Sequence, residues 1–288
     1  MNVSMSVGGM LATGAQRLRA AATDSGVTSA ELDAQVLLAH ALAVPRARLR
    51  SHPEAAADPR HVAHYLELIE RRAAGEPLAY LTGWREFWSL TLAVTPAVLV
   101  PRPETELLVE RALALRAAAE GRVADLGTGC GAVALALAAE RPRWQITATD
   151  LSGEALVVAR ANAARLAVTT VEFLEGSWFA PLAGAAFDLI VSNPPYVGAD
   201  DPALAGAALA HEPRLALTPG VDALSCLRTI VRGAPRHLAA GAWLLLEHGA
   251  LQGPALRDEL VLAGFRYVRS HRDLAGHERT TEGQHGQI

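Results

Sequence analysis

Lysine is absent from this chain of 288 residues, so all 26 basic residues are arginine. We interpret the missing lysine as a bias of genome composition and not as part of a mechanism. The balance of charge is not basic either, because 30 acidic residues leave a formal net charge of −4. A protein that grips a long phosphate backbone normally has a basic balance and a basic face, which disfavours DNA or naked RNA as the main partner.

Cysteines and long apolar runs are also scarce. Cys130 and Cys226 are the only cysteines, too few for a disulfide framework or a cysteine-rich metal site. The ten histidines are scattered along the chain, and we predict no metal site. No apolar run approaches the roughly 20 residues that span a bilayer, and no signal peptide is visible. We therefore expect a cytoplasmic protein that has no contact with a membrane.

Residues 1–78 have the pattern of a helical unit. Thr28 and Glu31 have the spacing of a capping box at the start of one helix. Asp58 followed by Pro59 predicts the start of a second helix, and apolar residues at helical spacing follow each start. We interpret this unit as a substrate-recognition domain that carries no chemistry of its own.

The residue pattern changes after Pro77. Apolar and polar residues alternate toward Thr95, which predicts strands or a hairpin. We therefore expect a β-hairpin linker at 79–100 and a main domain at 101–288.

The main domain alternates predicted strands with predicted helices. Such alternation is typical of an α/β fold in which helices cover both faces of a mainly parallel sheet. The predicted strands are 123–125, 145–150, 170–174, 187–192, 242–247, 265–269 and 279–281, and the predicted helices are 131–140, 153–166, 222–239 and 253–263.

Asn193-Pro194-Pro195-Tyr196 follows a predicted buried strand, so Asn193 lies where a strand end opens into a loop. In open α/β sheets, ligands bind at this edge. The Asn193 amide offers an oxygen acceptor, and the two prolines present a backbone carbonyl with no competing N–H. Two acceptors beside the ring of Tyr196 suit a planar NH₂ group, such as an amide or an exocyclic base amine. A proline-rich turn after a core strand is the alternative.

A glycine-rich turn lies between strand 123–125 and the next predicted helix. Gly127 and Gly129 let the backbone approach a ligand, and Asp150 ends the next strand, where a carboxylate can accept both hydroxyls of a ribose. This spacing also satisfies the dinucleotide fingerprint, so NAD remains open on this motif alone. Asp125 can pair with a ligand ammonium, and a methyl acceptor at Asn193 would lie against a sulfonium; both favour S-adenosylmethionine.

From Pro77 onward the sequence resembles the HemK/PrmC protein-(glutamine-N5) methyltransferases, which act on peptide-chain release factors. The resemblance implies a class I methyltransferase domain, with a Rossmann-like, mainly parallel seven-stranded sheet, behind a helical N-terminal domain and a hairpin linker. The shared motifs are Gly83-x-x-Glu86-Phe87, Pro101-Arg102-Pro103-Glu104-Thr105-Glu106, Asp125-Leu126-Gly127-Thr128-Gly129-x-Gly131, Ser192-Asn193-Pro194-Pro195-Tyr196, Glu212-Pro213 and Leu246-Glu247-His248-Gly249.

The resemblance also implies site residues. The catalytic set comprises Asn193, Pro194 and Tyr196. Contacts to S-adenosylmethionine are implied at Gly127, Thr128, Gly129, Cys130, Gly131, Asp150, Trp178 and Asn193. The substrate glutamine is expected at Asn193, Pro194, Pro195 and Tyr196, and we also predict Arg102 and Glu104 to be substrate-binding residues. Ser177 stands where the family often has an acid.

Three other functions remain open from the residues alone. An adenine-N6 DNA methyltransferase would use the same four-residue motif on a flipped base, but we see no basic target-recognition region. A guanine-N2 ribosomal-RNA methyltransferase would also need basic character in its accessory domain. A non-catalytic binding module would have no reason to keep both motifs intact. We expect a monomer that acts on release factors and does not bind DNA directly.

Overall fold

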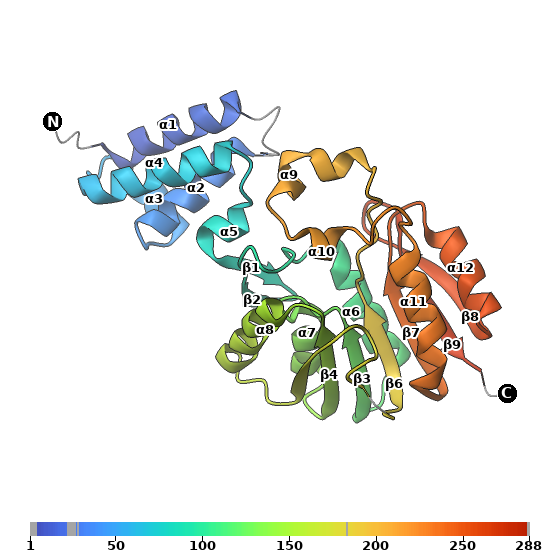
Figure 1. Ribbon diagram of the computed structural model, residues 1–288. Helices are drawn as coiled ribbons and strands as arrows, with labels where there is room; N and C mark the ends of the chain where they lie inside the picture. Colours follow the sequence, from blue (N-terminus) through green and yellow to red (C-terminus); the bar gives the residue numbers. More distant parts are fainter. Residues whose placement is uncertain (1–4, 22–26, 28, 183, 287–288) are drawn as a thin grey trace. The chain divides into compact units, whose positions relative to one another are not determined.

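The computed structural model describes residues 5–21, 27, 29–182 and 184–286 (Figure 1). The chain divides into two compact units. One consists of Met1–Trp84 together with Pro202–His211, and the other consists of Arg85–Asp201 together with Glu212–Ile288. Among the described residues, no helix is both long and apolar enough to cross a membrane.

The first unit is helical, as its sequence pattern predicts. Its elements are α1 (Val7–Ala20), α2 (Ala30–Ala41), α3 (Arg46–Ser51), α4 (Pro59–Ala73), α5 (Leu78–Thr82), the 3₁₀ turn η2 (Pro202–Ala205) and α9 (Ala207–Ala210). The apolar faces of α1 to α5 form one core, in which Leu37, Leu38, Tyr65 and Ile69 are fully buried.

Side-chain caps start the longer helices of this unit. The Asp58 carboxylate accepts a hydrogen bond from the Arg60 N–H at 2.8 Å, and Pro59 is the first residue of α4, so the predicted start is confirmed. Thr28, the predicted cap of the earlier helix, lies outside the described residues. The described cap of α2 is Ser29, whose hydroxyl accepts from the Leu32 N–H at 3.4 Å.

The predicted hairpin is shorter than the stretch from Pro77 to Thr95. Its strands are β1 (Trp84–Phe87) and β2 (Leu90–Ala93), and the stretch before them is helix α5. Pro77 precedes the first turn of α5, and Gly83, at φ 80°, ends the helix in the left-handed conformation. The hairpin therefore occupies only the later part of this stretch, because proline and glycine delimit a single helical turn before it.

The second unit is built on a seven-stranded sheet with the order β5-β4-β3-β6-β7-β9-β8. The strands are β3 (Gly121–Leu126), β4 (Trp144–Asp150), β5 (Val171–Glu175), β6 (Phe187–Ser192), β7 (Leu238–Glu247), β8 (Phe265–Arg272) and β9 (Glu278–His285). The first five strands of this order run parallel, and β9 is antiparallel to β7 and β8. The predicted mainly parallel α/β sheet is confirmed.

Helices cover both faces of the sheet. One face packs against α11 (Ser225–Gly233) and α12 (Gly253–Leu262) through a core that includes Leu126, Ile190 and Leu244. The residues that alternate with these along each strand point to the other face of the sheet. That face is covered by α6 (Glu106–Leu115), which follows the 3₁₀ turn η1 (Pro103–Thr105), and by α7 (Ala132–Glu140) and α8 (Gly153–Arg165).

The helix predicted at 222–239 is wrong in its length. Helix α11 ends at Gly233, the 3₁₀ turn η3 (Ala234–Arg236) follows, and β7 begins at Leu238. Pro235 lies in that turn, and a proline removes one helical N–H and clashes with the preceding turn, so the α-helix stops before it.

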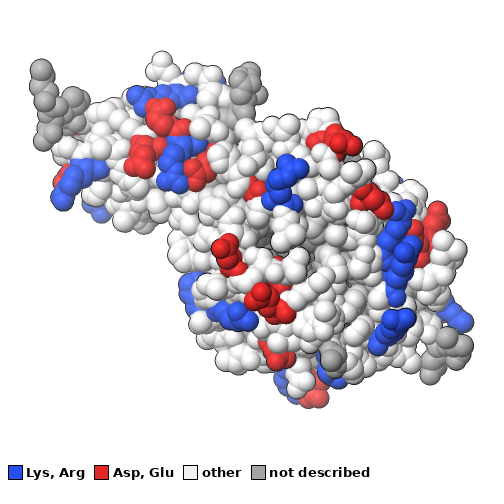
Figure 2. Space-filling model, viewed as in Figure 1, with Lys and Arg blue, Asp and Glu red and all other residues white. Residues whose placement is uncertain are grey.

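The described surface carries charges of both signs. On the face shown in Figure 2, arginine side chains are interspersed with acidic ones and form no continuous basic stripe. This distribution agrees with the net charge of −4.

Candidate active site

Parallel pairing brings the two sequence motifs to one edge of the sheet. Leu126, the last residue of β3, pairs with Ser192, the last residue of β6, and on its other side with Thr149 of β4. Paired strands lie about 4.8 Å apart, so the loops that leave β3 and β6 begin as neighbours. The Ser192 hydroxyl donates to the Leu126 carbonyl at 2.6 Å and ties the two ends together. Gly127 directly follows β3, and Asn193 directly follows β6.

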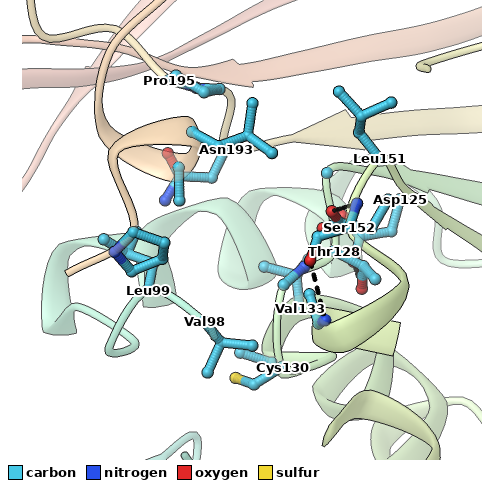
Figure 3. A pocket seen from close by; sticks show the side chains of 18 of the residues that line it. Val98, Leu99, Asp125, Thr128, Cys130, Val133, Leu151, Ser152, Asn193 and Pro195 are labelled. Carbon is cyan, nitrogen blue, oxygen red and sulfur yellow. Dashed lines mark hydrogen bonds between the residues drawn. The ribbon is translucent and has the colours of Figure 1, made fainter. Parts of the chain in front are cut away.

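These loops form the walls of a pocket of about 350 Å³. Figure 3 shows Asn193 and Pro195 lining the same pocket as Asp125 and Thr128. Most of the remaining lining is apolar. Of the predicted residues, the lining includes Arg102, Gly127, Thr128, Gly129, Cys130, Asp150, Trp178, Asn193 and Pro195, and it does not include Glu104, Gly131, Pro194 or Tyr196.

The glycine turn adopts a backbone that other residues rarely take. Gly127 and Gly129 have φ of 75° and 58°. A Cβ placed on Gly129 would meet nothing within 4 Å, so this glycine leaves open the space into which the pocket extends. The Gly129 N–H donates to an Asp150 carboxylate oxygen at 2.8 Å, which fixes the turn against the end of β4.

Two carboxyl groups lie beside this turn. Asp125 is only 2% exposed, and its carboxylate accepts from the Thr128 hydroxyl at 2.6 Å and from the Ala134 N–H at 3.2 Å. Burial raises its pKa to about 6. Asp150 accepts from the Ser152 N–H at 2.9 Å with its second oxygen, and burial raises its pKa as well.

Asn193 is held through its nitrogen. Its Nδ2 donates to the Thr105 hydroxyl at 3.1 Å, and Thr105 is buried in the turn before α6. The carboxyl group of Glu247, at the end of β7, is 1% exposed. The Tyr196 hydroxyl donates to the same carboxyl group at 3.2 Å. Burial raises the pKa of Glu247 to about 7.

Arg102 contributes to the pocket wall as part of an ion pair. Its guanidinium lies 2.6 Å from an oxygen of Glu212, whose side chain is almost completely buried. The other Glu212 oxygen accepts from the Val100 N–H at 3.2 Å. Glu212 therefore fixes the segment before η1. Arg102 lines the pocket, and its positive charge is neutralised by Glu212. Glu104 is exposed.

Trp178 packs against the glycine turn. It has a φ of 48°, and its carbonyl accepts from the Thr149 hydroxyl at 3.0 Å. A Cβ on Gly127 would lie 3.4 Å from its ring. The indole thus forms part of the pocket wall beside the turn, next to Ser177, which also lines the pocket.

Several supporting residues have no role in the sequence-based prediction. Thr105, Glu212 and Glu247 lie within recognised motifs, but the motifs do not reveal their partners. Asn162 of α8 is fully buried, and its amide makes three hydrogen bonds, of 2.7 to 3.0 Å, to the backbone of Ala93 and Cys130. Nothing in the local pattern around Asn162 distinguishes it from an ordinary polar residue of a helix.

Cys130 is 2% exposed, and burial raises the pKa of its thiol to about 12. A thiol in this state is not a nucleophile at neutral pH, which agrees with a packed residue in the turn. Among the described residues, no three His, Cys, Asp or Glu side chains are grouped as metal ligands would be.

The chain matches two protein families and many curated relatives. The PrmC N-terminal domain family matches residues 10–83, and the methyltransferase small domain family matches residues 103–222. The release factor glutamine methyltransferase of Vibrio cholerae is 49% identical over 262 residues, which cover 91% of this chain and 92% of the relative. The protein of the same name from Pseudomonas aeruginosa is 50% identical over 256 residues, or 89% and 93% of the two chains.

Solved structures agree with the fold. A methyltransferase from Pyrococcus furiosus superposes with a TM-score of 0.52 at 18% identity, covering 69% of this chain and 90% of that one. A T. thermophilus 16S rRNA N2 methyltransferase in complex with AdoMet and guanosine gives a TM-score of 0.52 at 19% identity, and the match covers 73% of this chain and 52% of that one. These two likenesses show a methyltransferase fold. The identity to the curated relatives goes further, and this chain belongs to the release factor glutamine methyltransferase family.

Proposed function

We propose that this chain transfers a methyl group from S-adenosylmethionine to the side-chain amide nitrogen (N5) of a glutamine in peptide chain release factors. The main structural support is the position of Asn193. Its amide lines a pocket whose other wall is the glycine turn, and parallel pairing of β3 with β6 places the two at neighbouring strand ends. The family relationship supplies the substrate class.

The pocket residues fit S-adenosylmethionine. Gly129 leaves open space at the turn, and Asp150 lies at the position where a carboxylate can accept ribose hydroxyls. Asp125 presents an acid toward the pocket for a ligand ammonium, and Trp178 offers an aromatic wall for a base. The cofactor, when bound, supplies an electrophilic methyl group.

The acceptors at Asn193 and Pro194 suit the other reactant. An amide nitrogen is a poor nucleophile because its lone pair is delocalised into the carbonyl. The Asn193 Oδ1 and the Pro194 carbonyl would accept the two N–H bonds of a glutamine side chain and orient its nitrogen. Positioning of this kind supplies about 7–11 kcal/mol in favourable cases. Acceptors aimed at the positive charge that develops on the nitrogen add to this.

The reaction needs no strong general base. The attacked nitrogen becomes very acidic once its new bond forms, so it loses its surplus proton readily. Two ionisable groups of this region contact the chain's own side chains: Glu247 accepts from Tyr196, and Arg102 is paired with Glu212. Their role in this proposal is to hold the acceptors in place.

The deciding experiment removes the Asn193 amide. We expect Asn193→Ala to lose methyl transfer to a purified release factor by about two orders of magnitude or more, measured with labelled S-adenosylmethionine. Cofactor binding, measured by calorimetry, should be largely retained. Near-normal transfer by the variant would refute the assigned role. Incubation of the wild-type protein with release factor, DNA or ribosomes in parallel tests the substrate, and label in DNA or ribosomal RNA alone would refute the proposed function.

A further inference from the structure

The loop that carries the predicted acceptors is held at both ends. At its start, Ser192 ends β6, which is paired with a strand on each side. At its far end, the Val197 N–H donates to the Leu217 carbonyl at 3.0 Å. Between these points, Pro194 and Pro195 have no N–H to donate. The direction of the Pro194 carbonyl therefore depends on what holds the far end of the loop.

One side chain from a different loop contributes to that hold. Gln252 lies between β7 and α12, and its Nε2 donates to the Tyr196 carbonyl at 2.9 Å. Its Oε1 accepts from the Gly249 N–H, also at 2.9 Å. Among the described residues, no other hydrogen bond reaches the backbone of Pro194, Pro195 or Tyr196. The Gln252 amide thus links the loop after β6 to the loop after β7.

The chemistry of its two partners fixes the orientation of this amide. A backbone N–H can only donate, and a backbone carbonyl can only accept. The Gln252 oxygen must therefore face Gly249, and the nitrogen must face Tyr196. An ionised glutamate of the same shape would have no proton for the Tyr196 carbonyl and would place oxygen against oxygen. The contact therefore needs a carboxamide or a protonated carboxyl group.

The residues before Gln252 allow this close approach. His248 is fully buried, and its Nδ1 donates to the Gly249 carbonyl at 2.9 Å. A Cβ on Gly249 would lie 3.2 Å from the Gln252 oxygen and 3.6 Å from the Tyr196 ring, so glycine leaves room for both. The Tyr196 hydroxyl also donates to Glu247 at 3.2 Å. The hydroxyl and the carbonyl of Tyr196 are therefore both bound by the segment from Glu247 to Gln252.

We propose that Gln252 is a positioning residue, which fixes the backbone of Tyr196 and thereby aims the Pro194 carbonyl at the substrate. Its part in catalysis rests on the proposed function. Gln252 is not among the residues that line the pocket, so it acts through the loop. Its replacement should therefore lower kcat and leave the affinity for S-adenosylmethionine, measured by calorimetry, unchanged.

The first test uses Gln252→Glu at two pH values. At about pH 8 the ionised carboxylate cannot donate to Tyr196, and kcat should be about tenfold below that of the wild type. Protonation restores the donor, and donation to a carbonyl raises the pKa of a carboxyl group. The ratio of variant to wild-type kcat should therefore recover at least about fivefold as the pH is lowered to about 5. A ratio near one at both pH values would overturn the proposal. So would a loss that does not recover, because a packing defect predicts that result.

The matched control is Gln284→Glu. Gln284 is half-buried like Gln252, and its amide also donates to a backbone carbonyl, that of Gly241, at 2.8 Å. Gly241 lies near the start of β7 and Glu247 at its end, about 20 Å away. The ratio of kcat to the wild-type value should stay near one at both pH values in this control. The same loss and recovery in Gln284→Glu would overturn the proposal.

A second test needs neither cofactor nor release factor. Gln252→Met keeps the length of the side chain and removes both hydrogen bonds, so the loop should open more often. Hydrogen–deuterium exchange of the Val197 N–H should then be at least about fivefold faster than in the wild type, and Gln284→Met should leave it unchanged. Equal exchange in the wild type and Gln252→Met would overturn the proposal. This comparison also decides the question should Gln252→Glu not fold.

Failure of the proposed function would look different. A wild-type protein that does not methylate release factors would refute the function, whereas the exchange rates would still report how the loop is held. Unchanged kcat in both Gln252→Glu and Gln252→Met, on an active wild-type background, would refute the positioning role alone.

Discussion

Replacing Glu247 with glutamine should make the protein more stable at alkaline pH. The carboxyl group is 1% exposed, and burial raises its pKa from an ordinary value of 4.5 to about 7, against the opposing effects of Thr105, Tyr196 and Arg279. Between these two values the folded protein binds more protons at Glu247 than the unfolded chain does. The free energy of unfolding therefore falls as pH rises through this window, by about 3 kcal/mol in total.

Glutamine stays neutral, so this loss is absent in Glu247→Gln. The difference in unfolding free energy, variant minus wild type, should rise by about 3 kcal/mol between pH 4.5 and about pH 8. Urea unfolding at several pH values measures it, followed by tryptophan fluorescence, because four of the five tryptophans lie in the unit that contains Glu247. Other titrating groups contribute equally to both proteins and cancel in the difference.

The control is Glu278→Gln. Arg257 lowers the pKa of Glu278, so the folded protein binds fewer protons at this group than the unfolded chain does, and the corresponding difference should fall slightly or stay level as pH rises, with no increase. A flat difference for Glu247→Gln as well would refute the reasoning, because it would mean that the Glu247 carboxylate is not destabilised by its burial.

Three further outcomes are expected. Asn162→Ala should lower the free energy of unfolding by about 3 kcal/mol in urea titrations, because three buried backbone hydrogen bonds to Ala93 and Cys130 are lost. Gly129→Ala should weaken S-adenosylmethionine binding at least about tenfold by calorimetry, since the added methyl group enters the pocket and φ is 58°, a strain of about 1 kcal/mol. If Asp125 pairs with the cofactor ammonium, the affinity for S-adenosylmethionine should fall as pH drops through about 6, the pKa of Asp125, because protonation removes the negative charge. Asp125→Asn should abolish that pH dependence.

The fold and the two central motifs could be predicted because their signals are local. A buried strand followed by Asn193, and another followed by Gly127, place both residues at carboxyl ends, and parallel pairing then makes them neighbours. The alternation of strands and helices predicts that pairing before any contact is known. Helix starts such as Asp58-Pro59 were predictable for the same reason.

The supporting contacts could not be predicted, because they join residues far apart in sequence. Asn193 binds Thr105 across 88 positions, and Tyr196 binds Glu247 across 51. No periodic pattern encodes such a pair. The packing of Pro202–His211 with the helical unit was missed as well, since this short segment interrupts the α/β unit without any change in composition that marks a boundary.

Three polar side chains in or next to the pocket wall are held by buried carboxyl groups. Asp125 holds Thr128 and the first turn of α7, Glu212 holds Arg102, and Glu247 holds Tyr196. These three acids are only 1% to 4% exposed, and burying them lowers the stability of the fold. Apolar residues of similar size would pack more favourably. Apolar residues, however, would leave the hydroxyls and the guanidinium free to rotate. We infer that this unit gives up stability for fixed directions of its donors and acceptors, which a reaction at a weakly nucleophilic amide requires more than it requires a strong base.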